Sequence, residues 1–158
     1  MKILQVIPKL GYGGAETGCY DLAHYLAEQD CKSYIITSGG ELLKYVRKDK
    51  VKVIKWPVHS KNPIIILVNV LFLTLFLLIF RIDIVHARSR APAWSCYFSC
   101  AITRKKFVTT FHGTYSFKSS IKKYQVGFIL IKKILVTGAA GFIGSALVKK
   151  LIIILKKT

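Results

Sequence analysis

The chain has 158 residues, enough for one hydrophobic core, and its 53% hydrophobic content excludes an intrinsically disordered protein. Lysine and arginine outnumber aspartate and glutamate by 25 to 7, and residues 84–158 contain 14 basic residues and no carboxylate. No Asp or Glu base or metal ligand can therefore come from residues 84–158, and the charge predicts anionic partners. The basic residues form scattered pairs without a recognisable nucleic-acid module, so no nucleic-acid partner is expected.

Strand and helix patterns alternate along the chain from its first residues, which read as a buried strand and not as a signal peptide. The expected strands cover residues 2–8, 33–37, 51–56, 82–86 and 107–111. A glycine-rich turn at residues 11–16 opens a first helix, and further helices are expected at residues 41–47, 62–80 and 91–101. This alternation predicts an α/β fold, with a Rossmann-like parallel sheet and flanking helices.

Residues 62–80, NPIIILVNVLFLTLFLLIF, contain no charged side chain and are apolar on all sides. The segment fits a buried crossover helix, a helix lying in the membrane interface, or a membrane span, although it is just short of the usual ~20 residues. A span would divide the sheet, because the next strand, IDIVHARSR, continues it. We therefore expect a buried or interfacial helix in a cytoplasmic protein that is peripheral at the inner face of the membrane.

The four cysteines form no CxxC pair, and the spacing of Cys96 and Cys100 places them on one helix face. Small buried apolar residues explain this spacing better than a metal site, which would need more ligands nearby. We therefore expect reduced thiols and no bound metal.

Three sequence blocks, MKILQVIPKLGYGGAE, IDIVHARSR and KKFVTTFHGTY, follow one another along the expected first, fourth and fifth strands. Together they resemble the N-terminal domain of glycosyltransferase family 4, over residues 1–124. The resemblance implies the acceptor-side domain of a retaining, metal-independent enzyme with two Rossmann-like domains, the GT-B fold. It also implies a nucleotide-sugar donor and a glycan or lipid-linked acceptor, with no cofactor required.

The glycine-rich loop after the first strand lies where ligands bind in parallel sheets, and Gly13 and Gly14 would let a phosphate approach the backbone. A tight turn without a ligand would have the same sequence. By the resemblance, Gly13 and Gly14 face the phosphates of the donor. His112, in the FHG motif with Gly113, would lie beside the transferred sugar as the catalytic residue, the alternative being a structural histidine.

Arg88 and Arg90 follow the fourth strand at the same sheet edge. They would bind a phosphate or carboxylate of the acceptor, the alternative being a solvated loop. His24, His59 and His86 have no comparable context and are interpreted as structural.

A second resemblance covers residues 133–151, KILVTGAAGFIGSALVKKL, which read as a strand, a Gly-x-x-Gly-x-x-Gly turn and a helix. This resembles the opening βα unit of an extended short-chain dehydrogenase/reductase, the class of the NAD-dependent epimerases and dehydratases, and defines a second region over residues 125–158. It implies NAD(P) binding by Gly138, Gly141, Phe142, Ile143 and Gly144. The ribose-binding acid and the Tyr-x-x-x-Lys pair of that class do not follow.

The leading hypothesis is a truncated glycosyltransferase of surface polysaccharide synthesis, formed by joining two neighbouring genes. It would be inactive alone and would need a separate chain carrying the donor domain. The alternatives are an NAD(P)-binding epimerase or dehydratase fragment, and a basic membrane-associated protein that uses residues 62–80 on an anionic membrane surface.

Overall fold

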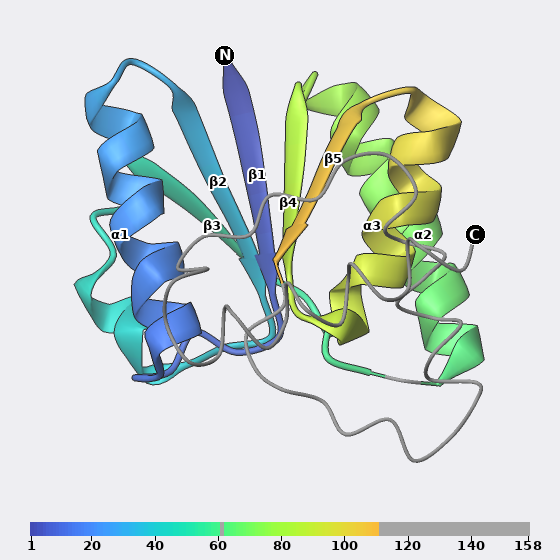
Figure 1. Ribbon diagram of the computed structural model, residues 1–158, viewed down its shortest axis with the longest axis horizontal. Helices are drawn as coiled ribbons and strands as arrows, with labels where there is room; N and C mark the ends of the chain where they lie inside the picture. Colours follow the sequence, from blue (N-terminus) through green and yellow to red (C-terminus); the bar gives the residue numbers. More distant parts are fainter. Residues whose placement is uncertain (61, 111–158) are drawn as a thin grey trace, which may run out of the picture. The chain divides into compact units, whose positions relative to one another are not determined.

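The computed structural model describes residues 1–60 and 62–110, and Figure 1 shows their arrangement. Five parallel strands form one sheet in the order β3-β2-β1-β4-β5. The strands are β1 (Lys2–Ile7), β2 (Lys32–Thr37), β3 (Val51–Lys55), β4 (Ile84–Arg88) and β5 (Lys106–Thr110). The helices are α1 (Gly14–Glu28), the 3₁₀ helix η1 (Glu41–Tyr45), α2 (Pro63–Ile79) and α3 (Arg90–Thr103). This strand order is that of a Rossmann-like sheet and confirms the predicted fold class.

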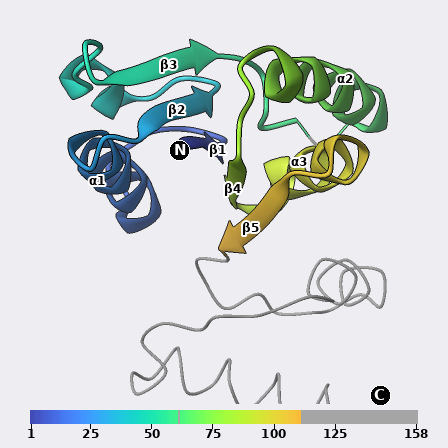
Figure 2. The same ribbon diagram turned by 90° about the horizontal axis from the view of Figure 1, so that it is seen from above.

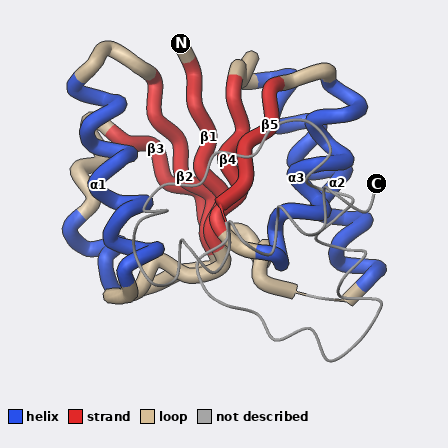
Figure 3. The backbone as a smooth tube through the Cα atoms, viewed as in Figure 1, coloured by secondary structure: helices blue, strands red, loops and turns tan. Residues whose placement is uncertain are grey.

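The central strands are buried because helices cover both faces of the sheet. Figure 1 and Figure 3 show α1 on one side and α2 with α3 on the other, and Figure 2 shows the same layers from above. Strands covered on both faces read as continuous apolar runs, as in the sequence KILQVI of β1. In the register of the sheet, Val6 of β1 lies between Ile36 of β2 and Ala87 of β4.

The side of the sheet that carries α1 has a core in which small helix residues meet large strand residues. Cys19 and Ala23 are the buried residues of α1, and both belong to a cluster with Ile7, Ile35 and Val51. Small side chains on the helix let its backbone lie close to the strands, which fixes where the first turn of α1 stands relative to the end of β1.

Helix α2 connects β3 to β4, so the predicted crossover helix at residues 62–80 is confirmed. Asn62 caps it, accepting a hydrogen bond from the Ile64 amide at 2.9 Å. One face, which includes Leu73 and Leu77, is buried against the sheet, whereas the opposite face is apolar and exposed. In the part of the chain that the structure describes, no helix is both long and apolar enough to cross a bilayer.

Most element boundaries differ by one or two residues from the sequence predictions. The short helix expected at residues 41–47 is a 3₁₀ helix that ends at Tyr45. The fourth strand begins at Ile84 instead of residue 82. Asp83 contacts the start of β1 partly through its side chain and not through a regular strand ladder. Its side-chain Oδ2 accepts from the Lys2 amide at 2.8 Å, and its own amide donates to the Lys2 carbonyl at 2.9 Å.

Candidate functional site

The glycine-rich loop leads from β1 into α1 at the carboxyl edge of the sheet, the edge to which all the strand arrows point in Figure 1. Gly13 is the N-cap of α1, and no side chain caps its first turn. A Cβ atom on Gly13 would overlap the carboxylate of Glu16, so Gly13 makes room for this side chain at the positive end of the helix. A Cβ atom on Gly14 would meet no atom of residues 1–60 or 62–110 within 4 Å, so the described structure leaves the backbone there open to a ligand.

The predicted site residue Arg88 lies beside this loop, at the end of β4, and is only 7% exposed. Its Nε donates to Oε1 of the buried Gln5 at 2.9 Å, and its Nη1 donates to the Ala15 carbonyl at 3.2 Å. Gln5 in turn donates from Nε2 to the Cys19 carbonyl at 3.1 Å. One buried network therefore joins β1, β4 and the first turns of α1.

Burial controls the protonation of this network. It lowers the pKa of the Arg88 guanidinium from its ordinary value, and the nearby Cys19 thiol partly opposes that shift. Burial also raises the pKa of Cys19 to about 12, even though the positive charge of Arg88 lowers it. The Cys19 thiol therefore stays protonated at neutral pH and cannot act as a nucleophile.

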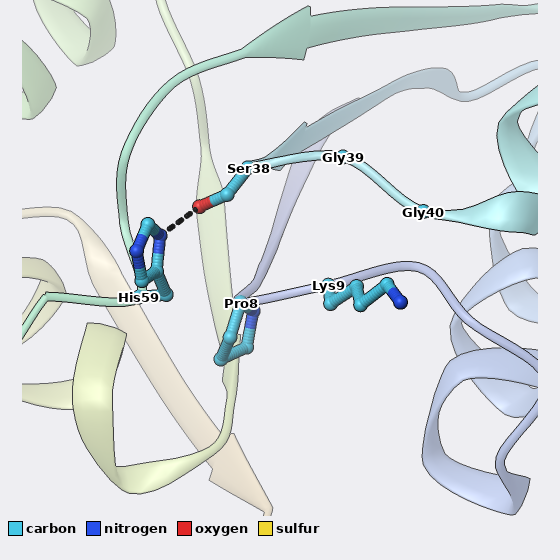
Figure 4. Close-up of a pocket in the computed structure, with 6 residues that line it drawn as sticks. All are labelled: Pro8, Lys9, Ser38, Gly39, Gly40 and His59. Carbon is cyan, nitrogen blue, oxygen red and sulfur yellow. Dashed lines mark hydrogen bonds between the residues drawn. The ribbon is translucent and has the colours of Figure 1, made fainter.

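A cavity of about 470 Å³ lies at the same edge, where the loops after β1, β2 and β3 meet (Figure 4). Its lining residues are Pro8, Lys9, Ser38, Gly39, Gly40 and His59. The Ser38 hydroxyl donates to the Trp56 carbonyl at 3.1 Å, and His59 Nδ1 lies 2.7 Å from the same hydroxyl oxygen. The tautomer of His59 decides whether its Nδ1 donates to this hydroxyl or accepts from it.

The loops after β1 and β2 hold each other in place through their backbones. The Leu10 amide donates to the Gly39 carbonyl at 2.7 Å, and the Leu42 amide donates to the Leu10 carbonyl at 3.0 Å. Gly40 has a φ of 140°, and a Cβ atom there would overlap the Leu10 backbone. Only glycine fits this position, and the close approach that it allows builds one wall of the cavity.

The structure places some of the predicted site residues at this edge of the sheet. The other predicted site residues lie outside the described residues. Gly13, Gly14 and Arg88 lie together, and Arg90 is the half-buried first residue of α3. The remaining predicted residues, His112, Gly113, Gly138, Gly141, Phe142, Ile143 and Gly144, fall outside the described residues. Their roles, the region boundary at residue 124 and NAD(P) binding all stay predictions.

His59 is a lining residue that the sequence did not reveal. It lies in the irregular segment between β3 and α2, where neither a motif nor a periodic pattern marks it. The Ser-Gly-Gly run after β2 was the only signal of a loop that comes close to it. Among residues 1–60 and 62–110, no three His, Cys, Asp or Glu side chains are grouped to hold a metal ion.

The chain is similar to known proteins in sequence and in fold. A family model, Glycosyltransferase Family 4, matches residues 12–143. The crystal structure of a glycosyltransferase from Rickettsia africae ESF-5 is 43% identical with a TM-score of 0.71, over 82% of this chain and 34% of that one. Acinetobacter baumannii MurG is 11% identical with a TM-score of 0.47, over 73% of this chain and 42% of that one. No curated protein matches.

The chain thus spans about a third of the length of the Rickettsia africae glycosyltransferase. The family match begins at the glycine-rich loop and continues past the predicted boundary at residue 124. The strand order β3-β2-β1-β4-β5, with helices on both faces, is the arrangement of the N-terminal half of a GT-B fold. The chain belongs to Glycosyltransferase Family 4.

Proposed function

We propose that the chain is the acceptor-side domain of a retaining glycosyltransferase, which moves a sugar from a nucleotide-sugar to a glycan or lipid-linked acceptor. The observation that supports this best is the open backbone at Gly14, beside Arg88, at the carboxyl edge of the sheet. Phosphates bind at such positions because backbone amides and a helix N-terminus favour negative charge. The acceptor would be a component of surface polysaccharide synthesis.

In this proposal each group at the edge has a separate task. The Gly13–Gly14 loop faces the donor phosphates, and the Glu16 carboxylate moves aside when they bind, because the two negative charges would repel each other. The His59 imidazole, which lines the cavity, forms a hydrogen bond with an acceptor hydroxyl. His112 supports charge that develops on the transferred sugar.

Transfer also needs a domain that binds the nucleotide-sugar, which in this family is the C-terminal one. We propose that the described domain transfers a sugar only together with such a domain, which the test supplies as a separate chain. The test mixes the purified protein with the rest of the Rickettsia africae glycosyltransferase, expressed as its own chain. Release of nucleoside diphosphate from a panel of nucleotide-sugars is then measured, with and without glycan and lipid-linked acceptors.

Two matched variants make this test specific to the site. In Gly14→Leu the new side chain projects into open space at the edge, so the helix should form normally while donor binding is blocked. Thr17→Leu adds a similar side chain to an exposed α1 position farther along the helix and should leave the rate near wild type. Full activity of Gly14→Leu, or no release from any donor in the mixture, would contradict the proposal.

A further inference from the structure

The outward face of α2 is an apolar stripe on the surface of the protein. Its exposed side chains recur every three or four residues, which places them along one side of the helix. We define the α2 stripe by these residues: Ile64, Leu67, Val68, Leu71, Leu75, Leu78 and Ile79. No charged residue occurs between residues 62 and 80 to interrupt it. A continuous apolar surface of this kind marks a site of interaction.

Helix α3 packs beside α2 on the same side of the sheet (Figure 2). The Ser99 hydroxyl of α3 lies 3.0 Å from the Val70 carbonyl of α2, so the two helices are in direct contact. Phe98 and Ile102, on the outward face of α3, are exposed. Trp94 stacks on Phe98 with ring centroids 5.9 Å apart, which adds an amphipathic aromatic ring of the kind found at membrane interfaces.

Cations gather where α2 and α3 end. Arg81 follows α2 and Arg104 follows α3, and both are exposed in the left-handed backbone conformation. A hollow of about 360 Å³ adjoins Phe80, the C-cap residue of α2, and is also lined by Tyr34, Lys48 and Lys52. None of the ion pairs between described residues includes these four basic side chains.

Charge decides between the partners that could cover the α2 stripe. A second copy of the chain would bring a second net charge of +18 to the contact and would be repelled. An anionic phospholipid surface would instead attract the basic residues at the helix ends while the stripe enters its apolar zone. Leu73 and Leu77 lie on the face of α2 that is buried against the sheet, so only the opposite face of the helix can enter the membrane. Helix α2 would therefore lie in the plane of the interface.

We propose that the protein binds anionic membranes through the α2 stripe, with lipid headgroups held at Lys48, Lys52, Arg81 and Arg104. The apolar side chains rest at the boundary between headgroups and acyl chains. The lysine-lined hollow beside Phe80 receives a headgroup phosphate. This surface lies on a helix-covered face of the sheet and does not depend on the proposed sugar transfer.

Vesicle flotation with the full-length protein tests the proposal. Wild-type protein should float with vesicles of phosphatidylcholine and phosphatidylglycerol at low salt, and much less with phosphatidylcholine alone. Leu71→Glu/Leu75→Glu places charges at two stripe positions that are 61% and 59% exposed, and should lower the partition coefficient at least tenfold. Its control is Tyr25→Glu, at a 59% exposed position on α1 across the sheet, which should bind like wild type.

A second pair of variants tests the charges. Lys48→Gln/Lys52→Gln should bind anionic vesicles roughly 25-fold more weakly, since each lysine near such a surface contributes about 1 kcal/mol. Lys44→Gln/Lys55→Gln removes the same charge from residues that do not line the hollow and should have a smaller effect. Circular dichroism confirms that every variant is folded.

Four outcomes would contradict the proposal. Wild-type protein could fail to float with anionic vesicles, or Leu71→Glu/Leu75→Glu could float as well as wild type. Sedimentation could also reveal a dimer that Leu71→Glu/Leu75→Glu abolishes, which would make a second copy the partner. Excess free phosphate that releases the protein at constant ionic strength would assign the hollow to a soluble anion instead of a headgroup.

Discussion

Arg88 is buried at the end of β4, and no ion pair among the described residues gives it a carboxylate partner. Its guanidinium is held by neutral acceptors, Oε1 of Gln5 and the carbonyl of Ala15, at 2.9 and 3.2 Å. Arg88→Met keeps most of the side-chain volume and removes both hydrogen bonds. Gln5 would then retain a buried oxygen without a donor.

The expected loss of stability follows from these contacts. Hydrogen bonds to a charged group contribute about 1.5–3 kcal/mol each, and a stranded buried acceptor costs about 1–3 kcal/mol. Part of this loss is recovered, because the variant no longer buries the guanidinium charge, whose burial also lowers the pKa of Arg88. We expect Arg88→Met to reduce the free energy of unfolding by about 3 kcal/mol.

Urea unfolding followed by tryptophan fluorescence and circular dichroism gives this free energy, and a double-mutant cycle with Gln5→Leu isolates the pair. The coupling between Arg88 and Gln5 should be about 1–2 kcal/mol, since the double variant no longer strands the glutamine oxygen. Arg47→Met is the control, because its ion pair with Glu28 at 3.2 Å is about half exposed and should contribute less than about 1 kcal/mol. A loss below about 1 kcal/mol for Arg88→Met, or strict additivity with Gln5→Leu, would refute the reasoning.

Three further predictions concern thiols, glycines and a buried amide. At pH 8 the folded protein should have one thiol that reacts rapidly with Ellman's reagent, Cys31, whereas the unfolded protein should have four reactive thiols. The other three cysteines are buried in the folded protein, and burial raises their pKa values. Folding raises the pKa of Cys19 from 9.0 to about 12, so the Cys19 thiol should not change the free energy of unfolding below pH 9. Between pH 9 and pH 12 the free energy of unfolding should fall, and a constant value in that range would contradict this prediction. Gly40→Ala should destabilise the protein by at least about 3 kcal/mol and Gly39→Ala by about 1–2 kcal/mol, because both have positive φ but only Gly40 meets the Leu10 backbone; equal melting temperatures would count against this. Asn69→Leu should lower the free energy of chemical unfolding by about 2 kcal/mol and change Trp56 fluorescence. The reason is that the Trp56 indole N–H, which lies 2.8 Å from Asn69 Oδ1, loses its acceptor. Unchanged emission would contradict this prediction.

Local sequence patterns were enough to predict the sheet, because short apolar runs separated by helical segments leave few alternatives to a Rossmann-like order. The start of the fourth strand was less accurate. It depends on hydrogen bonds between Asp83 and Lys2, which lie 81 residues apart, and no local pattern contains them. The character of α2 was also only partly predictable, since a helix that is apolar on all sides does not show which side is buried.

In the candidate site too, features with a local sequence signal were predictable, and contacts between residues distant in sequence were not. The Gly13–Gly14 loop was predictable because glycines after a first strand have a local meaning in parallel sheets. Arg88 was placed at the correct edge, but its partner Gln5 lies 83 residues away, so its burial could not be anticipated. His59 contacts Ser38, which lies 21 residues away in sequence, because the loops after β2 and β3 converge on one cavity. No local pattern predicts that contact.

The central position of β1 has a consequence for how the protein is made. Of the described strands β1 is synthesised first, yet it pairs with β4, and its Lys2 contacts Asp83, which lies 81 residues away in sequence. Contacts so distant in sequence form slowly, because a long loop must close first. Helix α2, with its apolar faces, is synthesised before β4 and β5 complete the sheet that buries one of them. The nascent chain is therefore expected to need chaperone protection until residue 110 has emerged.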